Sequence, residues 1–244
     1  MSRKVLLMIL DGWGIATNKK VSAIDKAKTP FIDSLYKKYP HSKLDASGMA
    51  VGLPEGQMGN SEVGHMNIGA GRIVYQELVR VNKAIEEKEL DNNPVLLDAI
   101  QYVKENEKSL HLIGLVSDGG VHSHINHLKG LLTIAHANGL KRVFVHAFTD
   151  GRDTDPKSGL GFLRELMAHM DKTCGQLASI TGRYYAMDRD KRWERTKLAY
   201  DALVHGSGLH TSDALKAIDK SYSEGVTDEF IKPIVLTHRD GSLI

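Results

Sequence analysis

The feature that most constrains the fold is an alternation of short apolar runs with helical patterns after residue 108. Strand-like runs are Leu110–Val116, Arg142–Phe148 and Leu177–Ile180, with a shorter one at Ile234–Leu236. Between and after them, apolar residues recur at helical spacing in Ile125–Asn138, Ser158–Asp171, Arg192–Val204 and Ser212–Lys220. Strands that alternate with helices predict right-handed βαβ units and a parallel sheet. The chain is therefore predicted to be an α/β protein.

Polar and charged clusters follow the carboxyl ends of three predicted strands. They are Ser117, Asp118, His122, Ser123 and His124 after the first, Asp150, Arg152 and Asp153 after the second, and Thr181, Arg183, Asp188 and Arg189 after the third. The carboxyl ends of neighbouring parallel strands meet at one crevice, so these clusters are expected to lie close together. The following segment, 190–195, is interpreted as a solvated helix start with local ion pairs.

Arginine in such a crevice suits a small phosphorylated acid, because its planar fork pairs with phosphate or carboxylate through two hydrogen bonds. A single arginine is more often a partner in a surface ion pair, and it is the joint placement of three that favours the pocket. Asp153, beside Arg152, is expected to orient or deprotonate a substrate hydroxyl.

A glycine-rich stretch from Gly48 to Gly71 marks a second candidate site. Within it, Gly59 and Asn60 predict a tight turn that opens a helix, so the Ser61 hydroxyl is expected at a helix N-terminus, where an anion is favoured. The ordinary alternative is that Ser61 only caps the helix. His65 is interpreted as structural.

Residues Lys4–Leu10 form a short continuous apolar run, typical of a buried parallel strand, that ends at Asp11. Asp11 is a candidate metal ligand at the strand tip, or else a turn aspartate bonded to its own backbone. Together with Ser61 it suggests a serine nucleophile activated by a divalent metal. A helix is predicted from Thr29, with Phe31, Leu35 and Tyr39 on a core-facing stripe, and a domain boundary is placed near residues 74–76.

Composition excludes several classes of protein. The chain has 244 residues, 41% of them hydrophobic and 25% charged, as in an ordinary soluble globular protein. Its net charge of +2 predicts neither a nucleic-acid nor a membrane partner. Cys174 is the only cysteine, which excludes an intrachain disulfide and a thiolate metal cluster. No segment has the roughly 20 apolar residues of a membrane span, and a cytoplasmic protein is predicted.

Five motifs in one order carry a resemblance that extends over essentially the whole chain. They are Asp11–Gly14, Gly59–His65, Val116–His124, Asp150–Asp153 and Thr181–Asp190. This set resembles the cofactor-independent (2,3-bisphosphoglycerate-independent) phosphoglycerate mutases of the alkaline phosphatase superfamily. The resemblance implies a parallel-sheet phosphotransferase domain inserted into an alkaline-phosphatase-like domain of which only the N-terminal part is present. Residues 1–74 would be that part, with the nucleophile, and residues 75–244 the substrate-binding phosphotransferase domain, truncated at its C-terminus.

The activity implied is the interconversion of 3-phosphoglycerate and 2-phosphoglycerate in glycolysis and gluconeogenesis, through a phosphoserine intermediate and without 2,3-bisphosphoglycerate. The resemblance implies two divalent metal ions, Mn²⁺ foremost, and a protein that is a monomer in its full-length form. The implied roles are catalytic for Ser61 and Asp153, metal-binding for Asp11 and Ser61, and substrate-binding for His122, Arg152, Asp153, Arg183 and Arg189.

Members of that family are considerably longer, and their remaining metal ligands lie in the half that this chain does not contain. The chain alone is therefore expected to bind manganese weakly and not to turn over, and residues 1–74 are expected to be disordered or to associate. Two alternatives stay open: another metal-dependent phosphatase or phosphomutase of the same superfamily, and a non-catalytic phosphoglycerate-binding module.

Overall fold

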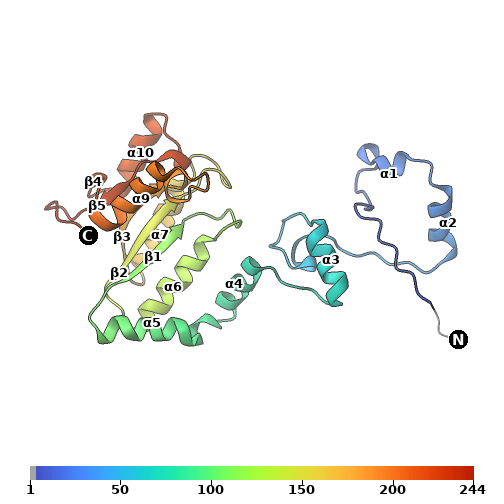
Figure 1. Ribbon diagram of the computed structural model, residues 1–244, viewed down its shortest axis with the longest axis horizontal. Coiled ribbons are helices and arrows are strands. Elements are labelled where there is room, and N and C mark those ends of the chain that lie inside the picture. Colours follow the sequence, from blue (N-terminus) through green and yellow to red (C-terminus); the bar gives the residue numbers. More distant parts are fainter. Residues whose placement is uncertain (1–3) are drawn as a thin grey trace. The chain divides into compact units, whose positions relative to one another are not determined.

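The computed structural model describes residues 4–244 and divides the chain into two compact units (Figure 1). The first unit extends to Gln76 and the second comprises Glu77–Ile244. All the strands of the described chain lie in the second unit. No helix among the described residues is both long and apolar enough to pass through a membrane.

A five-stranded sheet of order β1-β2-β3-β5-β4 organises the second unit. Its strands are β1 (Leu110–Leu115), β2 (Val143–Thr149), β3 (Gln176–Gly182), β4 (Leu209–Thr211) and β5 (Ile234–Leu236). The β1–β2, β2–β3 and β4–β5 pairs are parallel, which confirms the predicted α/β class. The β3–β5 pair is antiparallel, so the sheet is mixed and not wholly parallel as expected. β4 and β5 thus form a parallel pair that runs in the direction opposite to β3.

Helices surround this sheet (Figure 1). They are α4 (Glu77–Glu86), α5 (Pro94–Glu105), α6 (Ile125–Ala137), α7 (Gly159–Met170), α8 (Arg183–Ala186), α9 (Trp193–His205) and α10 (Ala214–Ser223). The sequence patterns described above do not predict α5, α8 or β4. The start of α5 nevertheless has a clear signal, because the Asn93 side chain accepts a hydrogen bond from the Leu96 amide and Pro94 occupies the first helical position.

The core of the second unit lies between the sheet and its helices. β3 is buried from Leu177 to Gly182, which is why it reads as a continuous apolar run and not as an alternating one. Leu132 of α6, Leu163 of α7 and Ile218 of α10 have no exposed surface and belong to the same cluster as Ile180 of β3. This core holds the carboxyl ends of β1, β2 and β3 in place.

The first unit is short of buried surface. Its helices are α1 (Ala23–Lys26), α2 (Pro30–Lys38) and α3 (Ser61–Ala70). Short 3₁₀ turns lie at Lys19–Val21 and Gly48–Val51 in this unit and at Leu90–Asn92 and Asp228–Phe230 in the other. Its buried apolar cluster contains only Val51, Leu53 and Val63 among the described residues.

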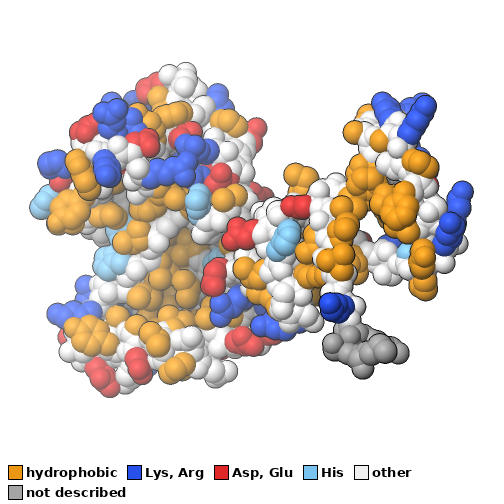
Figure 2. All heavy atoms as spheres, turned by 45° about the vertical axis from the view of Figure 1, so that its right-hand side comes forward, with side chains coloured by type: hydrophobic (Ala, Val, Ile, Leu, Met, Phe, Trp, Pro, Cys, Tyr) orange, Lys and Arg blue, Asp and Glu red, His pale blue; other side chains and the backbone are white. Residues whose placement is uncertain are grey.

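Two expectations about the first unit are wrong. Residues 4–10 form no strand, because no strand of the described chain pairs with them, and Val5 is 90% exposed. Helix α2 begins at Pro30 as predicted, but Phe31 and Tyr39 are largely exposed and not part of a core. Figure 2 shows hydrophobic side chains at the surface of this unit.

Candidate functional site

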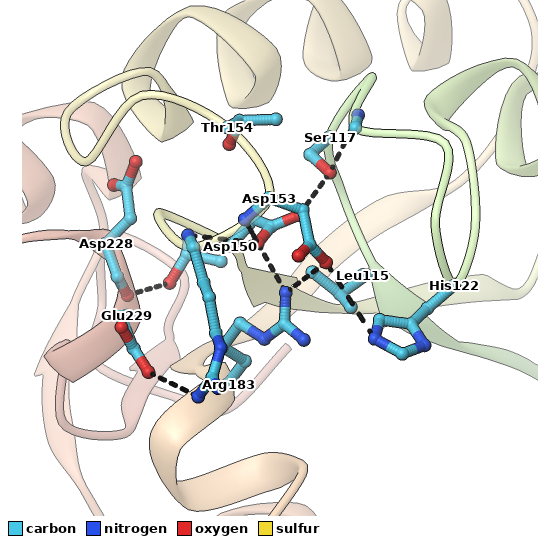
Figure 3. A network of polar contacts seen from close by, with 12 residues as sticks. Leu115, Ser117, His122, Asp150, Asp153, Thr154, Arg183, Asp228 and Glu229 are labelled. Carbon is cyan, nitrogen blue, oxygen red and sulfur yellow. Dashed lines mark hydrogen bonds and ion pairs between the residues drawn. The ribbon is translucent and has the colours of Figure 1, made fainter. Parts of the chain in front are cut away.

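Side chains from the ends of three neighbouring strands meet at one point in the second unit. Ser117 follows β1, Asp150 follows β2, and Arg183 begins the short helix after β3. The Ser117 hydroxyl donates to Asp150 Oδ2 at 2.7 Å, and Arg183 Nη1 donates to Asp150 Oδ1 at 2.6 Å (Figure 3). The predicted convergence of the strand-end clusters is therefore confirmed for these residues.

Asp150 organises the loop that carries two of the predicted site residues. Its Oδ1 atom accepts hydrogen bonds from the backbone amides of Arg152 at 3.2 Å and Asp153 at 3.0 Å. Burial alone would raise the pKa of this carboxyl, but the hydrogen bonds from Ser117, the Asp153 amide and Arg183 outweigh it and lower the pKa. Asp150 is thus a buried, ionised anchor for the loop.

Arg183 joins the loop after β2 to the helix after β3. Its Nη1 atom also donates to Asp153 Oδ2 at 2.6 Å, and its side chain is only 9% exposed. Burial opposes the charge of the guanidinium, but the hydrogen bonds to Asp153 and Asp150 raise its pKa. The side chain is therefore a permanently charged group at the floor of the site, fixed by two carboxylates.

His122, Arg152 and Arg189 are held more loosely. His122 Nε2 lies 3.8 Å from Asp153 Oδ2, and Arg152 Nη1 lies 3.6 Å from Glu229 Oε1. Arg189 is exposed and forms no ion pair with any residue between 4 and 244. None of these three side chains is held by two close carboxylates, as Arg183 is.

All five predicted substrate-binding residues border one pocket of about 410 Å³. The residues around it are Val121, His122, Arg152, Asp153, Arg183, Tyr184, Met187, Asp188, Arg189, Asp190, Arg195 and Glu229. The pocket lies wholly within the second unit. Four guanidinium groups and four carboxylates border the pocket, so the charges balance. The size of the pocket and its guanidinium donors suit a small molecule with anionic groups.

Arg195 and Glu229 are pocket residues that sequence analysis missed. Arg195 was placed in a solvated helix start, but its guanidinium lies 3.9 Å from the centre of the Tyr184 ring and 3.2 Å from Asp188 Oδ1. Spacing gave no signal for this contact, because Asp188 lies outside α9, which begins at Trp193. Glu229 lies far from the predicted motifs in sequence, and only the tertiary fold brings it to the pocket.

Ser61 begins α3 in the first unit, as the glycine-rich turn predicts. The N-cap is Asn60, whose side chain accepts from the Val63 amide at 3.0 Å, so the alternative that Ser61 only caps the helix is wrong. A side chain at Gly59 would place its Cβ 1.7 Å from the Ala46 carbonyl oxygen, which explains the glycine there. The Ser61 hydroxyl is left exposed at the helix N-terminus.

His65 is the polar side chain closest to Ser61. Its Nδ1 atom lies 3.2 Å from the Ser61 hydroxyl and 2.8 Å from the Ser61 carbonyl oxygen. A carbonyl oxygen can only accept, so the shorter contact requires a proton on Nδ1, and a protonated nitrogen is no base for the hydroxyl. This geometry favours the structural interpretation of His65.

Asp11 lies in an exposed turn of the first unit, where the Trp13 amide donates to the Leu10 carbonyl and Gly12 has a φ of 77°. No group of three or more His, Cys, Asp or Glu side chains among residues 4–244 is placed to hold a metal ion. Asp11 and Ser61 thus supply at most two ligands, fewer than a metal centre needs. The described residues do not fit a two-metal site by themselves.

Comparison with known proteins identifies relatives over most of the chain. Residues 81–243 match the family model described as "BPG-independent PGAM N-terminus (iPGM_N)". Proteins named 2,3-bisphosphoglycerate-independent phosphoglycerate mutase are 60% identical over 237 residues in Flavobacterium psychrophilum and 58% identical over 243 residues in Bacteroides thetaiotaomicron. These matches cover 97% and 100% of this chain, but 47% and 48% of the relatives. The chain spans about half the length of the curated relatives it matches.

A solved structure resembles the fold. It is described as "Crystal structures of Leishmania mexicana phosphoglycerate mutase at low cobalt concentration", and it matches with a TM-score of 0.72 at 35% sequence identity. The match covers 91% of this chain and 42% of the other chain.

Proposed function

Because this chain belongs to the family of the 2,3-bisphosphoglycerate-independent phosphoglycerate mutases, we propose that it takes part in interconverting 3-phosphoglycerate and 2-phosphoglycerate. The substrate would bind in the pocket of the second unit. The observation that carries this proposal is that Arg152, Arg183 and Arg189 border one pocket. A phosphoglycerate carries a phosphate and a carboxylate, and guanidinium groups pair with both.

The three arginines differ in what they can offer. Arg183 already contacts two carboxylates and supplies fixed positive charge, whereas Arg189 has no ion pair among the described residues and can bind an anion without breaking one. Arg152 makes a single 3.6 Å contact. Arg189 and Arg152 are therefore the side chains proposed to contact the anionic groups of the substrate. Arg183, whose hydrogen bonds to Asp150 and Asp153 both start from Nη1, is proposed to offer the substrate its remaining N–H groups from the pocket floor.

Asp153 is the proposed acceptor of the proton from a glycerate hydroxyl. Its Oδ2 atom lies between Arg183 Nη1, at 2.6 Å, and His122 Nε2, at 3.8 Å, so the carboxylate has a defined direction at the pocket wall. A general base must lie within hydrogen-bond reach of the proton it removes, and a substrate bound to the arginines would bring its hydroxyl near this carboxylate.

Ser61 is the proposed nucleophile that takes the phosphoryl group and returns it. The exposed Ser61 hydroxyl at the N-terminus of α3 supports this role, because an anion is favoured there. His65 is not placed as a base, so the hydroxyl would be activated by a metal and not by this histidine. We assign residues 1–74 to a metal-binding phosphatase domain and 75–244 to the phosphotransferase domain. Asp11 and Ser61 would be ligands of a divalent metal, Mn²⁺ foremost, only together with ligands beyond those described here.

Binding tests the pocket directly. We expect the 244-residue chain to bind 3-phosphoglycerate in isothermal titration calorimetry, and Arg189→Gln to weaken binding about tenfold, because a charge-assisted hydrogen bond is lost. Arg80→Gln is the matched control, since Arg80 is exposed on α4 and pairs with Glu77 on the same helix. Equal affinity in Arg189→Gln and the unchanged chain would contradict the pocket assignment.

Mutase activity tests the nucleophile, and it is measured on the protein as the native gene encodes it. Ser61→Ala is expected to abolish mutase activity while phosphoglycerate binding stays within twofold of the unchanged protein. Ser34→Ala is the control, because the Ser34 hydroxyl only donates to the Phe31 carbonyl on α2. Full activity in Ser61→Ala would overturn the nucleophile. Binding without turnover in the unchanged product would favour a non-catalytic phosphoglycerate-binding module.

A further inference from the structure

A segment distant in sequence from the predicted motifs crosses the ends of β2 and β3. We refer to Thr227–Ile231 as the crossing segment. The Gly182 amide donates to the Ile231 carbonyl at 2.7 Å, and the Thr149 hydroxyl donates to the Asp228 carbonyl at 2.7 Å. A Cβ on Gly182 would lie 2.4 Å from the Glu229 carbonyl oxygen, so the two backbones are in direct contact. The crossing segment is therefore fixed to the strand ends that carry the pocket.

The Asp228 side chain anchors the crossing segment to α7 and α10. It has no exposed surface, and its carboxylate accepts hydrogen bonds from the Gly159 amide at 2.7 Å and from the Tyr222 hydroxyl. A Cβ on Gly159 would lie 2.5 Å from Asp228 Oδ1, so the first turn of α7 also rests on this carboxylate. Backbone and side-chain hydrogen bonds together therefore tie the crossing segment to the strand ends and to α7.

The loop between Asp150 and Asp153 rests on the same segment. Gly151 has a φ of 66°, and a Cβ there would lie 2.8 Å from Asp228 Cβ and 2.9 Å from the Glu229 amide nitrogen. A glycine at this position is what lets the loop lie directly on the crossing segment. Arg152 follows Gly151 in the loop, and Glu229 belongs to the crossing segment. Their side chains therefore project from two backbones that are in direct contact.

Glu229 meets Arg152 at the pocket wall. The carboxylate side chain is 19% exposed and the guanidinium side chain 56% exposed, with 3.6 Å between Glu229 Oε1 and Arg152 Nη1. Figure 3 shows Glu229 next to Asp228 on the crossing segment, at the same site as Arg183 and Asp153. Arg152 is the only cation within ion-pair distance of Glu229 among residues 4–244. The aspartates of the pocket, Asp153, Asp188 and Asp190, pair with other arginines.

We propose that Glu229 is a positioning residue of the phosphoglycerate site, which holds one edge of the Arg152 guanidinium so that its other edge faces the bound anion. This inference rests on the proposed function. A long, half-exposed arginine loses rotamer freedom when it binds a ligand, and a fixed carboxylate on its far edge removes much of that loss beforehand. The carboxylate acts through Arg152 and does not touch the substrate.

The test is a double-mutant cycle on the full 244-residue chain, read as the Kd for 3-phosphoglycerate in titration calorimetry. Glu229→Gln keeps the shape of the side chain and removes its charge, and it is expected to weaken binding about tenfold. In an Arg152→Ala background the same substitution is expected to change the Kd by less than twofold. Glu229→Asp keeps the charge but loses the reach to Arg152, and it is also expected to weaken binding. Glu224→Gln, at an exposed glutamate that pairs with Lys220, is the matched control.

Two results would overturn the role of Glu229 and leave the proposed function intact. Binding by Glu229→Gln as tight as or tighter than in the unchanged chain would mean that the carboxylate does not help Arg152. An equal loss with and without Arg152 would mean that Glu229 acts on the fold, and thermal unfolding of each variant would show that loss as a lower midpoint. Failure of the unchanged chain to bind 3-phosphoglycerate would instead overturn the proposed function, and this inference with it. If Glu229→Gln does not fold, Glu229→Asp decides between these outcomes.

Discussion

Single residues in this protein acquire their chemistry from neighbours on other strands. His146 of β2 lies in a row with His111 of β1 and Ser179 of β3: His111 Nδ1 is 2.9 Å from His146 Nε2, and His146 Nδ1 is 2.8 Å from the Ser179 hydroxyl. Burial, and then the charge of His111, lower the pKa of His146 to about 4. His146 is therefore neutral in the folded protein at neutral pH.

The shifted pKa predicts a pH-dependent stability. In the unfolded chain His146 titrates at about 6.5, so the unfolded state binds the proton first as the pH falls. The stability is fully present above about pH 6.5 and is lost between that pH and about 4, by roughly 3 kcal/mol for this one group. Urea unfolding at pH 7.5 and pH 4 measures the loss.

His146→Gln isolates this contribution from the carboxylates that titrate in the same range. The amide can still hydrogen bond to Ser179 but does not titrate, so the loss between the two pH values should be smaller than in the unchanged chain. His136→Gln, at an exposed histidine on α6, should leave the loss as it is. An identical loss in His146→Gln and the unchanged chain would contradict the prediction.

At the scale of elements, helix starts follow local rules while strand ends depend on what crosses them. Asn60, Asn93 and Asp213 each accept a hydrogen bond from a backbone amide three residues on, as N-cap residues do. The end of β3, in contrast, is shaped by the crossing segment, whose backbone leaves no room for a side chain at Gly182. A small residue there is a requirement of packing and not of backbone conformation.

Gly182→Ala is predicted to destabilise the protein. The added Cβ would meet backbone atoms of Glu229 and Ile231 at 2.4 and 2.7 Å, and backbone cannot move aside as a flexible side chain does. The free energy of unfolding should fall by about 1–3 kcal/mol in urea titrations, with weaker 3-phosphoglycerate binding.

Gly161→Ala is the control for this prediction. Gly161 lies within α7 with no atom near its hypothetical Cβ, so alanine there should leave stability unchanged or raise it by up to about 1 kcal/mol. A Gly182→Ala variant as stable as Gly161→Ala would mean that the crossing segment is not held tightly against β3.

At the scale of the whole molecule, the two units differ in the size of their buried cores. The second unit has one continuous cluster that runs through β2, β3 and helices α5, α6, α7 and α10. The first has three buried apolar residues in the described chain, while Leu6 and Phe31 are 83% and 72% exposed. Resistance to local opening depends on buried apolar contacts, so the two units should open at different free energies.

Hydrogen exchange of the 244-residue chain checks this difference. We expect the amides of residues 4–45 to exchange nearly as fast as in denatured chain, and those of β2 and β3 to exchange only with global unfolding of the second unit. Protection of Lys4–Leu10 comparable with that of β3 would contradict this prediction, because it would mean that this run has a strand partner.

Local patterns alone determined the α/β class, the order of most elements and five residues of the pocket, His122, Arg152, Asp153, Arg183 and Arg189. The periods of strand and helix, and the clusters after each strand, depend only on neighbours in sequence, and parallel strands bring their ends together by geometry. The exposed serine on the first turn of α3 followed in the same way from the glycines before it.

The tertiary structure decided what depends on contacts between distant segments. It set β5 antiparallel to β3, left the apolar run at Lys4–Leu10 without a partner, and brought Glu229 to Arg152 across 77 residues of chain. A periodic pattern states which face of an element is apolar but not which element covers it, because pairing and packing are fixed by the free energy of the whole fold.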